Sequence, residues 1–555
     1  MLILLLVCLG LPLLTALLLL LFRGSMTADA ARWIALGGAI ATLLASLGLY
    51  DNYRTLPPVA AAQAGPIQPR FEYIRPWFNV QPAHTSDAAS SISLQMHLGL
   101  DGISMMMIML ATLLTVSAVL VSWRSIEDRP AEFYATLLAL ESGIIGVFCA
   151  FDLVLFYAFF EITLIPMFLL LIGWGGPRRK AAGMKFFLYT LCGGLITLLG
   201  LVALILTASR GGVTHASSLP ELARWLQAHP LDSHLQNALF LAICAGFLVK
   251  IPVFPFHSWL PETYVESPTA GSMLVSGLLA KLGTYGFLRL CLPLFPEASI
   301  NMGLPVIGCL SAIAVIYASL CALAASDMKR LVAYSSIAHV GLITLGLFAL
   351  NPQGLAGGVL QMANHGLSTG ALFLLVGILA ERFGTRRISD LGGVATRMPV
   401  LACSLVFIVM SSIGLPGLNG FIGEFLSLMG MFERHWLYAV LGTTGVVLGA
   451  WYTLSLLQSV LFGPEKTPAS VTAPVADLNL RECLSVLPLA VLCLWIGIYP
   501  KTALDLIRPD VESLAAVYAA PAAPLARQQT ELNLSQSDIP SLSSLDLRSG
   551  VRDGN

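Results

Sequence analysis

The sequence is poor in charged residues. Only 11% of its 555 residues are Asp, Glu, Lys or Arg, whereas a soluble protein carries about 25%, and 57% are hydrophobic. The formal net charge of −1 gives no support to a nucleic-acid partner or to any other strongly charged one. Such a chain is expected to lie in a lipid bilayer along most of its length.

Several motifs of cofactor and metal chemistry are missing as well. None of the ten cysteines belongs to a Cys-x-x-Cys pair or to a Cys/His cluster with metal-ligand spacing. There is no Gly-x-Gly-x-x-Gly after a strand and no Walker loop for a nucleotide phosphate. We therefore expect no cofactor and no metal in this chain, and an energy source outside it.

What the sequence does have is long apolar runs. Fourteen of them could cross about 30 Å of hydrocarbon, which predicts an all-α polytopic membrane protein with about 14 transmembrane helices. Their approximate ranges are 1–22, 32–50, 102–123, 134–150, 152–173, 183–207, 237–256, 269–292, 303–325, 330–349, 354–381, 399–432, 436–462 and 483–500. The first run lacks a preceding basic region, so a retained helix is favoured over a signal peptide.

The distribution of Lys and Arg supports this count. Basic residues gather in alternate connections, which the positive-inside rule assigns to the inner side, and both termini are then expected on the outer side of the membrane. The inner set comprises Arg23, Arg32, Arg124, Arg129, Arg178, Arg179, Lys180, Lys185, Lys329, Arg330, Arg382, Arg386, Arg387, Arg397, Lys466 and Arg481. The short outer connections hold little beyond Arg289 and Arg434 near their ends.

A weak internal repeat divides the chain. The fourth member of each five-helix set is interrupted, at Lys250-Ile-Pro252-Val-Phe-Pro255 and at Gly414-Leu-Pro416-Gly417, which predicts two inverted repeats with two broken helices. The expected parts are 1–133 with a long outer loop at 51–100, a first repeat at 134–292 (helices 4–8), a second at 303–462 (helices 9–13), a last helix within 463–510, and a polar tail at 511–555. The tail is expected to be weakly ordered, with a short amphipathic surface helix as the alternative.

Six ionisable residues fall near the middle of the apolar runs. A charge at the bilayer centre costs at least about 2.5–3.5 kcal/mol, so such residues mark functional sites by default. Each also has a structural interpretation: Glu161 and Lys250 could form a static pair, the histidines could be satisfied core residues, and Glu424 could cap its own helix. The six are Glu161, Lys250, Lys281, His339, His365 and Glu424. Glu141 lies nearer the start of its run, and structural pairing and an accessory role are equally favoured for it.

Groups of this kind suit proton relay. Burial lowers the proton affinity of lysine readily, and histidine titrates near neutral pH. A carboxylate about 4 Å from a lysine contributes about 4 kcal/mol at an effective dielectric near 20, which is about three pKa units. Moving Glu161 toward or away from Lys250 could therefore load and unload a proton.

Longer motifs around these residues resemble the antiporter-like subunits of respiratory complex I, and most closely the M-type subunits of that family. The resemblance rests on Lys250-Ile-Pro through Lys281, on Lys329-Arg-Leu through His339, on His365-Gly-Leu and on Leu415-Pro-Gly-Leu-Asn-Gly-Phe-Ile-Gly-Glu424. Leu98-Gly-Leu-Asp101-Gly-Ile-Ser104 and Gly173-Trp-Gly-Gly176 fit as well, and the similarity covers roughly residues 95–500.

The resemblance implies a place in the membrane arm, between neighbouring antiporter-like subunits, and proton translocation coupled to NADH oxidation and quinone reduction elsewhere. It assigns Glu161 and Lys250 to a charge-switch pair, Lys281 to the centre of the relay, His339 and His365 to its connection, and Glu424 to its outlet. An Mrp-type cation/proton antiporter subunit, a membrane subunit of an energy-conserving hydrogenase and a non-pumping spacer remain alternatives.

Overall fold

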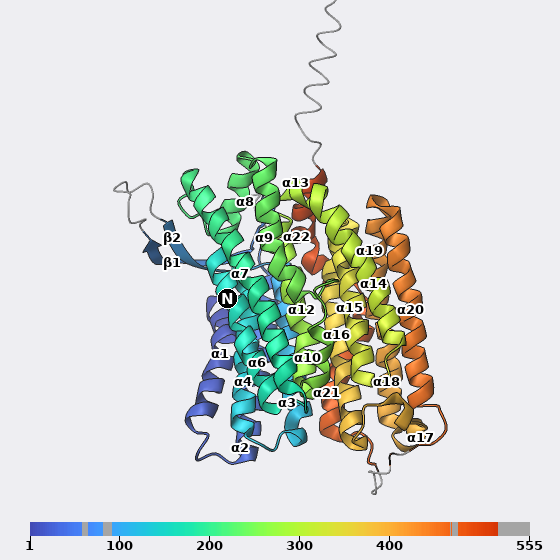
Figure 1. Ribbon diagram of the computed structural model, residues 1–555. Helices are drawn as coiled ribbons and strands as arrows, with labels where there is room; N and C mark the ends of the chain where they lie inside the picture. Colours follow the sequence, from blue (N-terminus) through green and yellow to red (C-terminus); the bar gives the residue numbers. More distant parts are fainter. Residues whose placement is uncertain (58–64, 81–91, 467, 469–474, 520–555) are drawn as a thin grey trace, which may run out of the picture.

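The computed structural model describes residues 1–57, 65–80, 92–466, 468 and 475–519. Within these ranges the chain is a bundle of long, roughly parallel helices (Figure 1). The helices succeed one another along the bundle, with α1 and α2 at one side and α20 at the other (Figure 1). This arrangement is the all-α polytopic fold expected from the apolar runs.

The first part of the chain contains four long helices and one β-hairpin. The helices are α1 (Leu2–Leu21), α2 (Ala28–Arg54), α3 (Gly102–Ser125) and α4 (Pro130–Cys149). Strands β1 (Phe71–Val80) and β2 (Ile92–Leu100) pair antiparallel, with Phe71 opposite Leu100. The sequence predicts only a long loop at 51–100. In the structure, residues 71–80 and 92–100 of this segment pair as the two strands of the hairpin.

The middle of the chain is made of shorter, interrupted helices. In order they are α5 (Leu153–Ile162), α6 (Leu164–Trp174), α7 (Arg179–Arg210), α8 (Leu219–Ala228), α9 (Ser233–Lys250), α10 (Leu260–Glu266), α11 (Thr269–Leu274), the π-helix η3 (Val275–Leu279), α12 (Ala280–Gly286) and the π-helix η4 (Phe287–Cys291). Helices α11 to η4 form one continuous rod whose two π-segments shift its register.

The last part begins with the short helix α13, which leads into a third π-segment. In order the elements are α13 (Pro296–Ala298), η5 (Ser299–Ile307), α14 (Gly308–Leu323), α15 (Met328–Leu347), α16 (Pro352–Phe383), the 3₁₀ turn η6 (Ile388–Asp390), α17 (Val394–Arg397), α18 (Pro399–Ser412), α19 (Asn419–Arg434), α20 (Trp436–Val460), α21 (Leu480–Ile498) and α22 (Lys501–Ala519). Helix α22 extends into the segment expected to be weakly ordered, and residues 520–555 lie outside the described residues.

By length and composition, 13 helical stretches among the described residues could cross a membrane, against the 14 predicted. The difference is the run at 399–432, which is divided into α18 and α19, each too short to count alone. Gly414 (φ +75°) and Gly417 (φ +92°) adopt left-handed backbone between them, a conformation that glycine adopts without steric cost. The division into two inverted repeats stays a prediction.

The two ends of the bundle differ. One end, here called the hairpin face, carries β1, β2, α8, α13 and α22 (Figure 1). The other, the basic face, joins the connections in which the sequence places Lys and Arg: Arg23 pairs with Glu132, Arg178 with Glu266 and Arg386 with Asp327. These three ion pairs join connections that the alternation assigns to one side, and the orientation of the termini stays a prediction.

Burial is greatest at the centre of the bundle. The most apolar stretches of Thr269–Cys291 and of α16 are entirely enclosed by other helices, whereas those of α1, α20 and α21 are one-third buried. The outer helices therefore present apolar side chains to their surroundings, as a bilayer or a partner subunit requires. The enclosed helices are those that carry Lys281 and His365.

Candidate functional site

Lys281 occupies the centre of the bundle and has no solvent exposure. Its ammonium Nζ donates to the carbonyl oxygen of Ser276 and lies against Nδ1 of His365. The π-helix η3 explains the first contact, because its wider turn places residue i+5 over residue i. The local break in α-helical register thus gives the lysine a backbone acceptor that a regular helix would use internally.

His365 continues the row into a neighbouring helix. Its ring lies on α16, 5.6 Å from the ring of His339 on α15, measured between centroids. His339 Nδ1 is 2.9 Å from Oε1 of Glu424, which also accepts a hydrogen bond of 3.1 Å from the amide of Gln361. Lys281, His365, His339 and Glu424 therefore form one contiguous series across four helices.

Amide side chains hold Glu424 in place. Asn364 donates to the carbonyl oxygen of Asn419 at 2.7 Å, and Asn419 returns a bond of 3.3 Å to the carbonyl of Asn364. This reciprocal pair joins α16 to the first residue of α19, just after the break that contains Pro416. The helix that bears Glu424 is thereby tied to α16, which carries His365.

A narrow cavity adjoins the end of this series. It is lined by His339, Glu424 and Tyr452, and by three glycines of α20, Gly442, Gly445 and Gly449, among others. Its volume is about 10 Å³. That space corresponds to about one water molecule in a polar site.

Lys250 lies at a different kind of break. It is the last residue of α9, ahead of the irregular segment 251–259 that contains Pro252 and Pro255. Its Nζ donates to the carbonyl oxygen of Phe160 and to Oγ1 of Thr163, both at 3.4 Å, and lies 4.3 Å from the Phe160 ring centroid. These groups belong to the junction of α5 and α6, so two helix ends meet at the lysine.

The Glu161 carboxylate lies against α7. A Cβ atom on Gly194 would lie 2.0 Å from Oε1 of Glu161, so only glycine leaves room for the carboxylate there. Among the ion pairs of the described residues, none joins Glu161 to Lys250 within 4.0 Å. The two residues predicted as a switchable pair are therefore neighbours that are not in contact in this conformation.

The predicted series of relay residues is interrupted at one place, between Lys250 and Lys281. In the part of the chain that the structure describes, no hydrogen bond links the two lysines or their direct partners. The helix ends pack instead through apolar groups: a Cβ on Gly283 of α12 would meet Ile251 at 2.5 Å. The predicted series is thus two clusters, Glu161–Lys250 and Lys281–Glu424.

Glu141 stands apart from both clusters. It is 1% exposed in α4, and neither carboxyl oxygen has a hydrogen-bond partner among the described residues. The next residue, Ser142, donates to the carbonyl of Leu9, so this part of α4 faces α1. The structure brings Glu141 to no member of the predicted row.

Sequence reasoning missed a second set of buried charges at the hairpin face. Arg289 forms an ion pair with Asp101, and Asp510 accepts from the backbone N–H of Ile103 at 3.2 Å. Arg289 was assigned to the end of an outer connection, but it is 4% exposed. The available signal was an arginine within an apolar run, eight residues after Lys281. Among the described residues no three His, Cys, Asp or Glu side chains converge as metal ligands; the prediction of no cofactor stays a prediction.

Comparisons with known proteins show the family to which this fold and sequence belong. The family described as NADH:quinone oxidoreductase/Mrp antiporter, transmembrane, matches residues 150–449. NADH-quinone oxidoreductase subunit M of Rhodobacter capsulatus is 41% identical over 504 residues, which cover 90% of this chain and 93% of that protein.

Solved structures agree with the sequence comparison. A chain of respiratory complex I from Thermus thermophilus with bound NADH superposes with a TM-score of 0.78 and 31% identity, covering 93% of this chain and all of that one. A chain of the Mrp complex from Dietzia sp. DQ12-45-1b shares the fold, with a TM-score of 0.76 at 19% identity over 94% of this chain and 99% of that one. The chain therefore belongs to the NADH:quinone oxidoreductase/Mrp antiporter family of membrane proteins, beside the subunit M proteins of NADH-quinone oxidoreductase.

Proposed function

We propose that this chain is a proton-translocating membrane-arm subunit of NADH:quinone oxidoreductase. The observation that carries the proposal is the contiguous series Lys281–His365–His339–Glu424, buried at the centre of the bundle. Every member can bind and release a proton, and burial of four such groups is costly unless they serve a purpose. Relatives named as subunit M of this oxidoreductase, 41% identical over most of the chain, support the assignment.

Each residue has a distinct task in this proposal. Lys250 holds a proton at the α5–α6 junction, and Glu161 sets its charge by approaching or withdrawing. Lys281 receives the proton, His365 and His339 carry it laterally, and Glu424 passes it to the small cavity beside α20. The apolar contact between α9 and α12 separates the two clusters until the helix ends at Pro252 and Pro255 shift, which prevents a continuous leak.

The subunit supplies no redox chemistry of its own in this proposal. NADH oxidation and quinone reduction take place elsewhere in the complex, and this chain needs no cofactor for moving protons. Its partners are the neighbouring antiporter-like subunits of the membrane arm, and apolar helices such as α1 and α20 face them or lipid. The hairpin face is the outer side of a bacterial inner membrane and the basic face the inner side, following the positive-inside rule.

The test is substitution in the first cluster within the assembled complex. Lys250→Ala and Glu161→Ala are expected to abolish most NADH-driven proton pumping while assembly persists, because each removes a proton-holding or charge-setting group. Lys180→Ala, an exposed lysine of α7, is the matched control. A normal proton-to-electron ratio in both variants contradicts the pumping role, and sodium-dependent transport without NADH indicates an Mrp-type antiporter instead.

A further inference from the structure

A pair of cysteine thiols lies on the contact between the two elements that carry the relay lysines. Cys244 belongs to α9, which ends at Lys250, and Cys291 belongs to η4, on the same rod as Lys281. Both cysteine side chains are fully buried, and the Cys244 thiol donates to Sγ of Cys291 across 3.4 Å. Among the described residues, this is the one hydrogen bond that joins two thiols.

Apolar groups continue this contact from the thiols toward the two lysines. The ring of Phe247 on α9 meets that of Phe287 on η4 edge to face, with 6.0 Å between centroids. A Cβ on Gly286 would lie 2.5 Å from Cε1 of Phe247, so glycine lets the two elements approach closely. Next comes the contact between Gly283 and Ile251 that separates the two clusters. The thiols, the rings and that contact form one antiparallel seam, here called the α9–rod seam.

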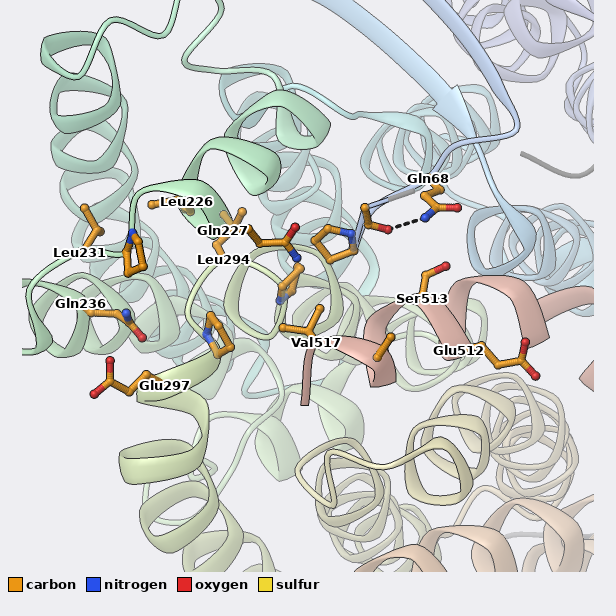
Figure 2. A pocket seen from close by; sticks show the side chains of 16 residues that line it. Gln68, Leu226, Gln227, Leu231, Gln236, Leu294, Glu297, Glu512, Ser513 and Val517 are labelled. Atoms are coloured by element: carbon orange, nitrogen blue, oxygen red, sulfur yellow. Dashed lines mark hydrogen bonds between the residues drawn. The ribbon is translucent and has the colours of Figure 1, made fainter. Parts of the chain in front are cut away.

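The α9–rod seam reaches an open groove at the hairpin face. Gln236, in the first turn of α9, and Leu294, three residues after Cys291, line this groove of about 710 Å³ (Figure 2). Oε1 of Gln236 accepts a hydrogen bond of 2.9 Å from the N–H of Ala298, which joins the two walls there. The hairpin face is the outer side in the proposed orientation, and outer compartments lack the thiol reductants of the cytosol. A small oxidant thus has access to the outer end of the seam.

The two thiols are placed for a bond to each other. A disulfide bond is about 2.05 Å long, so the sulfur atoms need to approach by about 1.4 Å, which rotation about the Cα–Cβ bonds can supply. Once one sulfur is oxidised, the other is held beside it, and groups held in this way react far faster than free molecules do. The exposed cysteines Cys192 and Cys403 have no hydrogen-bonded thiol neighbour among the described residues.

We propose that Cys244 and Cys291 are a redox modification site, joined by hydrogen peroxide into a disulfide that fastens the α9–rod seam. The peroxide O–O bond breaks as one thiol is oxidised to a sulfenic acid, and one water leaves. The second thiol then attacks that sulfur, the S–O bond breaks, the S–S bond forms and a second water leaves. The two sulfur atoms lose two electrons in total, the peroxide oxygens gain them, and both thiol protons leave in water.

The disulfide stops proton transfer between the two clusters. This part of the inference rests on the proposed function, in which Ile251 and Gly283 must separate before a proton can pass. Cys244 lies seven residues before Ile251, and Cys291 lies eight residues after Gly283, about two helical turns in each case. A covalent bond this near resists the separation of α9 from the rod, so the modified subunit keeps its clusters apart.

The test treats the assembled complex in sealed vesicles with hydrogen peroxide. We expect mass spectrometry to detect the Cys244–Cys291 cross-linked peptide, and NADH-driven proton pumping to fall at least about fivefold and to recover after a phosphine reductant. In Cys291→Ser the cross-link cannot form, so pumping should be normal before treatment and the loss that the reductant reverses should be absent. Cys192→Ser, which removes an exposed thiol instead, is the matched control and should respond as the unsubstituted complex does.

Absence of the cross-linked peptide after peroxide treatment overturns the modification site. An equal reversible loss of pumping in Cys291→Ser, or unchanged pumping in complex that carries the cross-link, overturns its effect on transport. If Cys291→Ser fails to assemble, Cys244→Ala decides by the same measurements. The proposed function is tested separately by Lys250→Ala. Normal pumping in that variant refutes the function whatever the thiols do, whereas loss of pumping there, with no cross-link in the treated complex, refutes only the thiol pair.

Discussion

The two clusters of the buried row are built differently. Lys281, His365, His339 and Glu424 contact one another through side chains of continuous or reciprocally tied helices. Lys250 instead rests on a backbone carbonyl and a threonine hydroxyl where two helices end, and its acidic neighbour lies out of contact. The first arrangement suits conduction and the second suits switching, because a charge at a helix junction can change partners with a small movement.

The largest expected effect comes from breaking the continuous cluster. Glu424→Ala removes the acceptor shared by His339 and Gln361, and a hydrogen bond to a charged group is worth about 1.5–3 kcal/mol, so coupled activity should fall at least about tenfold. Glu433→Ala, exposed on the same helix, serves as control. NADH-driven pumping by reconstituted complex measures the effect; full activity of Glu424→Ala would mean that protons bypass this cluster.

A glycine substitution tests the switching cluster without removing any charge. In Gly194→Ala the new methyl group would overlap Oε1 of Glu161 and displace the carboxylate. We expect coupled activity to fall about fivefold, equivalent to roughly 1 kcal/mol. Gly173→Ala, where nothing lies within 4 Å of the added atom, should have no effect. Equal activities of the two variants would show that the position of Glu161 is unimportant.

Thr163→Val removes one of the two polar contacts of the Lys250 ammonium and keeps the shape of the side chain. Since the carbonyl of Phe160 remains, the loss should be about 0.5–1 kcal/mol, or roughly a threefold decrease in coupled turnover. Thr207→Val in α7 provides the comparison. An unaffected turnover in Thr163→Val would indicate that the lysine is held by other groups during the cycle.

Glu141→Gln should have the smallest effect. Its carboxyl group contacts no member of either cluster, and glutamine preserves its volume. Pumping is expected to stay within about twofold of the unsubstituted complex, because the substitution removes no contact of either cluster and creates no cavity. A loss comparable with Glu424→Ala would make Glu141 a third station of the relay.

The sequence identified the parts that follow from local pattern. Long apolar runs predict the helices, and ionisable residues within them predict the Lys281–Glu424 cluster. It did not show that Glu161 turns toward Gly194, since that depends on how α5 packs against α7. Nor did it show the burial of Arg289 beside Asp101 and Asp510. Asp101 lies about 190 residues before Arg289 in the chain and Asp510 about 220 residues after it.

The strands at 71–80 and 92–100 were missed for a related reason. Pro76 lies inside β1, next to a register shift in the ladder, and a proline in such a run argues against a strand. The other residues of β1 form the ladder with β2, and the register shift beside Pro76 accommodates the N–H that proline lacks. The run at 399–432 differs, because its own Gly414-Leu-Pro416-Gly417 predicts a break, and α18 ends at Ser412 while α19 begins at Asn419.

The central claim is that Lys281 releases and rebinds a proton in each cycle and does not serve only as a fixed positive charge. The most direct measurement is the proton-to-electron ratio of the assembled complex in sealed vesicles with Lys281→Arg, since arginine keeps the positive charge but does not release its proton. The account predicts a lowered ratio or a loss of coupled turnover, with assembly intact. A ratio and turnover equal to those of the unsubstituted complex would contradict it.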